Sequence, residues 1–267
     1  MEIVKEFEDS KNLVDNKIIG SPEIKNSEIT FIGTNNILVC NNNTKISNSK
    51  LIFKGNNSIV FLSSDLGIYF NLIIYNNSTV YIGKDVLMGH SINFNIQEGQ
   101  NIIIGDDCII GNKVNIFTSD NYPIYDIKTK SRINYSDSVF IGDHVWLGRF
   151  TYVSKGVKIG SGSIIYDKSV LPQYMRIKSN SYLLGNPARI IKDNVFFVKD
   201  YVGNFKSDDS LNSEKYISDV FVYHFESKET LDLNKLDNIL KELSVLDRLD
   251  FIKKLFLKNK LRNRFAI

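Results

Sequence analysis

The sequence predicts an all-β protein, a solenoid of stacked parallel coils, and three observations support this prediction. A six-residue unit recurs in phase from Ile82 onward, in which Gly often follows an aliphatic residue. Upstream, turn residues recur at equal intervals, at Gly33, Gly55, Asn77 and Gly99. Ile, Val, Tyr, Phe and Asn are plentiful while Pro is scarce, a composition typical of strands and turns.

The six-residue units define the coil. They read IGKDVL, MGHSIN, IGDDCI, IGNKVN, IGDHVW, LGRFTY, VSKGVK, IGSGSI and IYDKSV. Short strands joined by tight bends at this period wrap into a triangular coil, and the aliphatic residue of each unit points inward. Each coil buries its apolar row only against its neighbours, so several coils are needed for stability. The fifth places suit a narrow corner: Val86, Ile92, Cys108, Val114, Val145, Thr151, Val157, Ser163 and Ser169.

The upstream segment has the same organisation in a looser form. Strands are expected to begin at Ile37, Ile59 and Val80, each after a turn rich in Asn or Gln. We therefore expect wider coils with longer corners in this part of the chain.

Composition excludes several classes of protein. The hydrophobic fraction is 43%, the charged fraction 24% and the net charge +3, which is too small to indicate a nucleic-acid partner. The two cysteines are far apart, which disfavours a disulfide framework and a thiolate metal site. The first residues, MEIVKEFEDSKN, contain no secretory signal, and no apolar run is long enough to span a membrane. A cytoplasmic location is predicted.

The repeat is interrupted between Ile116 and Ile141, where a loop of about residues 119–138 is expected. It carries the segment YPIY around Pro123 and several basic residues. A long insertion in a tight solenoid is usually functional.

The segments YPIY, RIN, IGDHVWLGR, KGVKIG and GNPARIIKDN resemble the hexapeptide-repeat O-acetyltransferases, a family that includes capsular polysialic-acid, galactoside and maltose acetyltransferases. The resemblance covers roughly residues 30–195. It implies a left-handed parallel β-helix, although parallel crossovers are ordinarily right-handed. It also implies acetyl-CoA as co-substrate, a carbohydrate acceptor, and a homotrimer with its active sites between subunits.

The resemblance also implies a general base. In the family, a His immediately before the Pro of the loop takes the proton of the acceptor hydroxyl. Tyr122 stands at that position here, and a phenol is a poor base at neutral pH. One coil earlier the family commonly has Asn where this chain has His90. One hypothesis is that the base has moved to His90, with Tyr122 as its hydrogen-bonding partner and Asp120 orienting the base. In the alternative, His90 is an ordinary surface residue of the coil, another group is the base, and Asp120 opens the loop as an Asx turn.

Further site residues follow from the resemblance. Trp146 is expected to form an aromatic wall beside the acceptor or the pantetheine, or else to pack between subunits. His144 and Tyr125 are further candidates for the acceptor side, and His144 is also suited to a hydrogen bond that holds a loop. Basic residues toward the last coils suit the phosphates of CoA, although each can also be a solvated surface charge. The candidates for CoA are Trp146, Arg149, Lys155, Lys168, Arg189 and Lys192.

A zinc site is an alternative prediction, because γ-type carbonic anhydrases share this fold. Such a site needs three His ligands. The chain has His90, His144 and His224, of which the last lies outside the repeats and the first two occupy different places of the unit. No metal is predicted.

The C-terminal part departs from the repeat. We divide the chain into a β-helix of residues 1–194 and an extension of 195–267 that is helical from about 231. Residues 195–226 have no clear organisation, whereas apolar residues from Leu231 to Arg264 have helical spacing, with Asp232 as the N-cap. The end of the chain is basic. An amphipathic helix or helix pair packed on a neighbour and a peripheral membrane contact both fit this pattern.

The sequence therefore predicts an acetyl-CoA-dependent O-acetyltransferase that modifies a hydroxyl of a cell-surface sugar of a capsule or lipopolysaccharide. A catalytically inactive relative that binds sugar or CoA is one alternative, because of Tyr122. An N-acetyltransferase acting on an amino sugar nucleotide is a second alternative.

Overall fold

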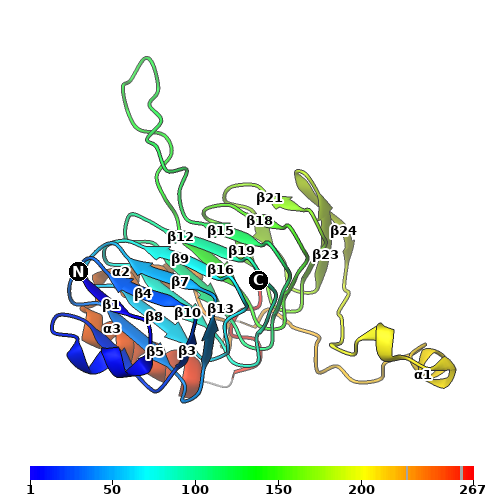
Figure 1. Cartoon of the computed structure of the whole chain (residues 1–267). Helices are drawn as coiled ribbons and strands as arrows, with labels where there is room; N and C mark the ends of the chain where they lie inside the picture. The colour runs from blue at the N-terminus through cyan, green and yellow to red at the C-terminus, as the bar shows by residue number, and fades with distance from the viewer. Residues whose placement is uncertain (227, 259–260) are drawn as a thin grey trace.

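The computed structural model describes residues 1–226, 228–258 and 261–267. Three parallel sheets form the sides of a solenoid, which confirms the predicted β-helix, and helices from the C-terminal part lie against one side (Figure 1). The inserted loop projects away from the coil, and the segment that carries the short helix α1 projects from it separately, after β24 (Figure 1).

The strands of the three sides follow one another in chain order. Sheet 1 contains β1 (Glu2–Val4), β4 (Glu28–Phe31), β7 (Lys50–Phe53), β9 (Asn71–Ile74), β12 (Asn93–Ile96), β15 (Asn115–Phe117), β18 (Tyr152–Val153) and β21 (Val170–Leu171). Sheet 2 contains β2 (Lys17–Ile19), β5 (Ile37–Cys40), β8 (Ile59–Leu62), β10 (Thr79–Ile82), β13 (Asn101–Ile104), β16 (Val139–Ile141), β19 (Lys158–Ile159) and β22 (Arg176–Ile177). Sheet 3 contains β11 (Leu87–Met88), β14 (Ile109–Ile110), β17 (Trp146–Leu147), β20 (Ile164–Ile165), β23 (Ser181–Gly185) and β24 (Ala188–Asp193). The third side of the first coils is the pair β3 (Glu23–Lys25) and β6 (Lys45–Ser47).

The remaining elements are short helices. Residues Phe7–Asn12 (η1) and Val202–Asn204 (η2) form 3₁₀ turns, and Ser207–Asn212 forms α1. The helices α2 (Leu233–Glu242) and α3 (Val245–Ile252) are followed by a π-helical turn, η3 (Lys253–Lys258).

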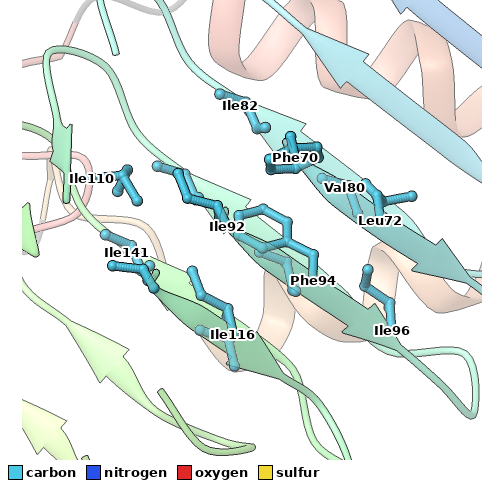
Figure 2. Packing of buried hydrophobic residues seen from close by; sticks show 14 of the residues in the cluster. Phe70, Leu72, Val80, Ile82, Ile92, Phe94, Ile96, Ile110, Ile116 and Ile141 are labelled. Carbon is cyan, nitrogen blue, oxygen red and sulfur yellow. The ribbon is translucent and has the colours of Figure 1, made fainter. Parts of the chain in front are cut away.

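Stacked apolar rows form the core of the coil. Phe70 and Phe94, Leu72 and Ile116, and Val80 and Ile141 all point into the space that the three sheets enclose (Figure 2). The small fifth-place residues are buried as well, including Ser163 and Ser169 with no exposed surface. The periodicity therefore identified the inward side of the strands correctly.

Coil length changes along the chain as expected. Asn71 and Asn93 occupy equivalent places 22 residues apart, whereas Asp143 and Ser161 are 18 residues apart. The longer upstream coils turn through Asn residues with positive φ, such as Asn57 at 59° and Asn77 at 55°. Asn tolerates this left-handed backbone better than other residues with a Cβ.

Both ends of the solenoid are closed by an antiparallel strand. β1 pairs antiparallel with β4 at the N-terminal end, and β24 pairs antiparallel with β23 at the C-terminal end. The reversed strands pair with backbone groups of β4 and β23 that would otherwise form outer edges of sheets 1 and 3.

The outer side of sheet 2 is a second core. Helices α2 and α3 lie against it, and their apolar residues Leu236, Leu240 and Ile252 pack on sheet residues such as Phe61 and Phe140 (Figure 1). Asp232 caps α2, because its carboxylate accepts the amides of Asn234 and Lys235. The apolar side of the helices is thus used within the chain. One residue of the basic end, Lys260, lies outside the described residues.

The three sides of the solenoid differ in what they present. Sheet 1 shows polar side chains such as Asn71, and sheet 2 is covered by the helices. Sheet 3 carries an outward stripe of apolar residues that pair strand to strand, of which Leu87 is 56% exposed and the others partly exposed. The stripe consists of Leu87, Ile109, Trp146, Ile164 and Tyr182. Within the described residues, we find no helix of the length and hydropathy that crossing a membrane requires.

Candidate functional site

The inserted loop lies between β15 and β16 and is anchored at its base by an ion pair. Arg132 donates two hydrogen bonds to the Glu98 carboxylate, at 2.6 and 2.9 Å, and the Ser136 hydroxyl donates another at 2.5 Å. The bonds from Arg132 and Ser136 lower the pKa of Glu98 to about 2. Glu98 belongs to the coil before the loop, so this contact fixes the loop to the solenoid.

A second anchor is Asp120, at the start of the loop. Its carboxylate accepts hydrogen bonds from Lys155 at 2.5 Å, Gln173 at 2.8 Å and Asn134 at 2.9 Å. Burial raises the pKa of Asp120, but the bonds from Lys155 and Asn134 outweigh it and the pKa is lowered. Asp120 thus accepts three hydrogen bonds, and these bonds hold the start of the loop to the coil.

Lys155 is placed differently from our expectation. Its side chain is 1% exposed and its ammonium group pairs with Asp120 inside the corner. A buried ammonium group that is paired with a carboxylate is not free to bind the phosphates of CoA.

Asn134 positions the segment that contains Tyr122. Its side-chain amide donates to the carbonyl of Tyr122 at 2.9 Å, and its side-chain oxygen accepts the amide of Ile124 at 2.7 Å. The two legs of the loop are thereby tied together around Pro123, and the Tyr122 side chain is left 80% exposed. Asn134 was not among the predicted site residues, although it belongs to the RIN segment that supported the resemblance.

Tyr125 lies farther along the same loop. It faces Arg132 across an isolated antiparallel bridge and is 56% exposed. Beyond it, Asp126 accepts the amides of Lys128 and Thr129 and closes the tip as a turn.

His90 and Tyr122 are not brought together within one chain. His90 is exposed at the corner before β12, where its backbone amide donates to Asn112 of the next coil. Tyr122 comes after β15. The parallel strands of sheet 1 all begin at one corner of the coil and end at the next corner. His90 and Tyr122 lie at these two different corners, so they are separated by the length of a strand, roughly 10–13 Å.

His144 is enclosed. Its ring has no exposed surface and is stacked between Phe197 and Phe221, with ring centroids 4.1 and 3.9 Å away. Its two nitrogens lie 2.6 Å from the Asp107 carboxylate and 2.9 Å from the Phe197 carbonyl. His144 therefore holds the C-terminal segment to the coil, and its ring has no surface exposed to an acceptor.

Trp146 lies in the middle of the apolar stripe of sheet 3. Toward the C-terminal end the stripe passes through Tyr182, which pairs across the hairpin with Lys192, and Arg189 follows on the same face. Cross-strand partners point to the same face of a sheet, so the stripe ends beside two exposed cations.

Two further cations lie at the corner between sheets 3 and 1. Arg149 pairs with Asp167 at 2.7 Å and remains 64% exposed, and Lys168 is exposed beside it. Both are on the same corner as His90, which is two coils away from Arg149. Among the described residues, no group of three His, Cys, Asp or Glu side chains is arranged to hold a metal ion.

The sequence and the structure are similar to those of known proteins. Residues 138–173 match the family model "Bacterial transferase hexapeptide (six repeats)". The structure is similar to that of the polysialic acid O-acetyltransferase OatWY, with a TM-score of 0.63 and 30% identity, over 74% of this chain and 95% of that one. It is also similar to the polySia-specific acetyltransferase NeuO, with a TM-score of 0.56 and 26% identity, over 74% of this chain and 97% of that one.

A curated relative matches a shorter stretch. A polysialic acid O-acetyltransferase of Escherichia coli O1:K1 / APEC is 32% identical over 91 residues, which are 34% of this chain. The matched stretch spans 29% of the length of that relative.

Proposed function

This chain belongs to the hexapeptide-repeat acetyltransferases, and on that premise we propose that it transfers an acetyl group from acetyl-CoA to a hydroxyl of a cell-surface glycan. The observation that carries the proposal is the likeness to OatWY, which extends over 95% of that structure at 30% identity. Polysialic acid, named in the descriptions of these similar proteins, is the first acceptor to test.

We propose a homotrimer with the site between subunits, because the candidate residues of one chain lie on different sides. Sheet 2 is already covered by α2 and α3, so it is closed to a second subunit. The stripe of sheet 3 is the apolar side that remains, and it includes Trp146. A neighbour packed on this side would bring its own loop, and so Tyr122, toward Trp146 and the His90 corner. Burying exposed apolar surface is the main favourable term in such an association.

The same side suits acetyl-CoA. A half-exposed apolar row is complementary to the pantetheine arm, and Arg189 and Lys192 at its end are complementary to phosphates. When bound, acetyl-CoA supplies the activated acyl group. Trp146 would flank the arm, while Arg149 and Lys168 at the neighbouring corner would add positive charge.

His90 is our candidate for the base. Of the three histidines of the chain, His144 is enclosed and His224 belongs to the C-terminal extension, so His90 is the exposed imidazole of the coil. It would accept the proton of the acceptor hydroxyl as the oxygen forms its bond to the acetyl carbonyl carbon. The carbon–sulfur bond then breaks, and the proton passes to the departing thiolate. Tyr122 would donate a hydrogen bond to the acceptor or to His90.

A catalytically inactive relative is the second candidate, and one observation favours it. The loop presents Tyr122 where the family has its His, with the ring 80% exposed and the backbone held by Asn134. The loop is therefore built to present a side chain that is a poor base.

The test is release of CoA from acetyl-CoA in the presence of polysialic acid and of a panel of other glycans, together with the mass in solution by light scattering. The proposal predicts acceptor-dependent release and a mass of about three times 30.5 kDa. It would be contradicted by a monomer that neither releases CoA nor gains thermal stability from acetyl-CoA, since a ligand that binds the native state must stabilise it.

A further inference from the structure

The outer side of sheet 1 carries a ladder of side-chain amides. Asn71 donates to Asn93 at 3.1 Å, and Asn93 donates to Asn115 at 3.0 Å, one rung in each coil. Successive rungs are about 4.8 Å apart, the spacing of neighbouring strands. Asn93 uses its second donor on the Ser91 carbonyl at 3.4 Å, and Asn115 uses one on the Lys113 carbonyl at 3.2 Å. Asn71 and Asn115 therefore each keep a donor, and all three amides keep an acceptor lone pair that can face outward.

The amides continue to the base of the inserted loop. In the neighbouring outward positions, Asn95 and Gln97 both donate to the side-chain oxygen of Asn121, at 3.4 and 2.9 Å. Asn121 directly precedes Tyr122. The polar surface of sheet 1 is thus continuous with the segment that carries the candidate site.

Aromatic rings stand at the end of the ladder. Tyr152 follows Asn115 in the register of sheet 1, and its ring meets that of Phe117 edge to face at 5.4 Å. Both side chains are partly exposed on the outer face. A flat aromatic face beside outward amides can contact the C–H face of a sugar ring while the amides bond its hydroxyl and acetamido groups.

We propose that the outer face of sheet 1 is a binding surface for the acceptor glycan chain, formed by Asn71, Asn93, Asn115, Phe117 and Tyr152. This inference rests on the proposed function and deepens it, because it names a chain and not a single sugar or sugar nucleotide as the acceptor. The chain would run along the ladder, and its end would reach the site through Asn121. The ladder itself is uncharged and repeats at a fixed spacing, which suits a repeating polymer of hydroxyl and amide groups.

The experiment uses polysialic acid and a short sialic acid oligomer as probes, first without acetyl-CoA. Asn71 is an exposed end rung, so it can be changed without opening the core. Asn71→Asp should weaken binding of the anionic chain about threefold and Asn71→Lys should strengthen it about threefold, the scale of one surface charge interaction. Tyr152→Leu should weaken binding about fivefold.

The matched control is the amide ladder at a corner of the same solenoid. Asn57 takes part in the ladder Asn35–Asn57–Asn77, and Asn57→Gly removes its side chain while Gly keeps the left-handed backbone. This variant should bind polysialic acid as the wild type does. Opposite effects of the two Asn71 variants cannot arise from loss of folding, which would weaken binding in both.

The second readout is the ratio of kcat/KM for the long chain to kcat/KM for the short oligomer. Asn71→Asp should lower this ratio about threefold. Binding that changes as expected without acetyl transfer would keep the surface and overturn the proposed function. The opposite outcome is acetyl transfer in which Asn71→Asp, Asn71→Lys and Tyr152→Leu change neither this ratio nor chain binding. That outcome would keep the function and overturn the surface.

Discussion

Two corners of the solenoid use charged residues for opposite purposes. At the corner between sheets 2 and 3, Arg264 is 3% exposed and pairs with Asp143 at 2.6 Å and Asp106 at 2.8 Å. At the corner between sheets 1 and 2, Glu98 and Asp120 hold the inserted loop while remaining 43% and 23% exposed. The first corner, here called the closed corner, locks the C-terminal segment onto the coil. The second, the loop corner, holds the inserted loop by its base and leaves Tyr122 exposed.

The two corners also differ in their hydrogen bonds. At the closed corner, the partners of His144 are a carboxylate and a carbonyl, and both can only accept. At the loop corner, the donors to the two carboxylates belong to the loop segment itself or to later coils. They are Arg132, Asn134 and Ser136 of the loop segment and Lys155 and Gln173 of later coils. Burial thus fixes one segment, and partial exposure lets the other present a residue.

The largest effect is expected from opening the closed corner. Arg264→Met leaves Asp143, whose side chain is only 13% exposed, without its cation, and burial already holds the pKa of Asp143 above its ordinary value despite Arg264. The free energy of unfolding should fall by about 3–5 kcal/mol, measured by urea denaturation. Arg262→Met, which removes an exposed guanidinium bonded to the Val222 carbonyl, should change it by less than about 0.5 kcal/mol. Equal losses in the two variants would show that the buried ion pair of Arg264 is not what stabilises this corner.

A smaller loss is expected at the loop corner. Lys155→Met removes the buried ammonium, but Asp120 keeps its bonds from Asn134 and Gln173 and stays within reach of water. The free energy of unfolding should fall by about 2 kcal/mol, and the amide hydrogens of the loop should exchange faster than they do in the wild type. Lys168→Met serves as the control, because that side chain is exposed. If Lys155→Met costs as much as Arg264→Met, the loop corner is as closed as the other.

The smallest effect concerns Glu98 and its dependence on pH. Its pKa falls from an ordinary 4.5 to about 2 in the folded chain. A lowered carboxyl pKa contributes stability that is complete above 4.5 and is lost as pH falls toward 2. The wild type should therefore melt above Glu98→Gln at pH 6, and the gap in Tm should close across that interval. A gap that persists at pH 2 would show that the charge of Glu98 is not what holds the loop.

Most of the fold could be predicted because it depends on local period. The inward residues of the coil, the change from long to short coils and the Asp232 cap are all set by neighbours in sequence. What could not be predicted depends on distant partners. Arg264 appeared only as one residue of a basic chain end, but its partner Asp143 is 121 residues away. Likewise, Phe197 and Phe221 enclose His144 from a segment without any period.

The inserted loop could be predicted, but the surroundings of the candidate cations could not. Spacing and resemblance located the loop and its Tyr122, but they could not separate exposed cations from a cation buried in an ion pair. Arg149 and Arg189 are exposed as expected, whereas Lys155 is buried against Asp120. The role of Asn134 was invisible because an amide that ties two legs of a loop leaves no periodic mark in the sequence.

The rate of acetyl transfer to polysialic acid decides whether His90 has taken over the role of the family base. If it has, we expect measurable transfer in the wild type and a loss of about 100-fold or more in His90→Ala, the usual scale for a general base. Binding of acetyl-CoA should be retained in that variant, and Tyr122→His should gain little. Wild-type transfer that survives His90→Ala would contradict the account, as would an inactive wild type that becomes active through Tyr122→His.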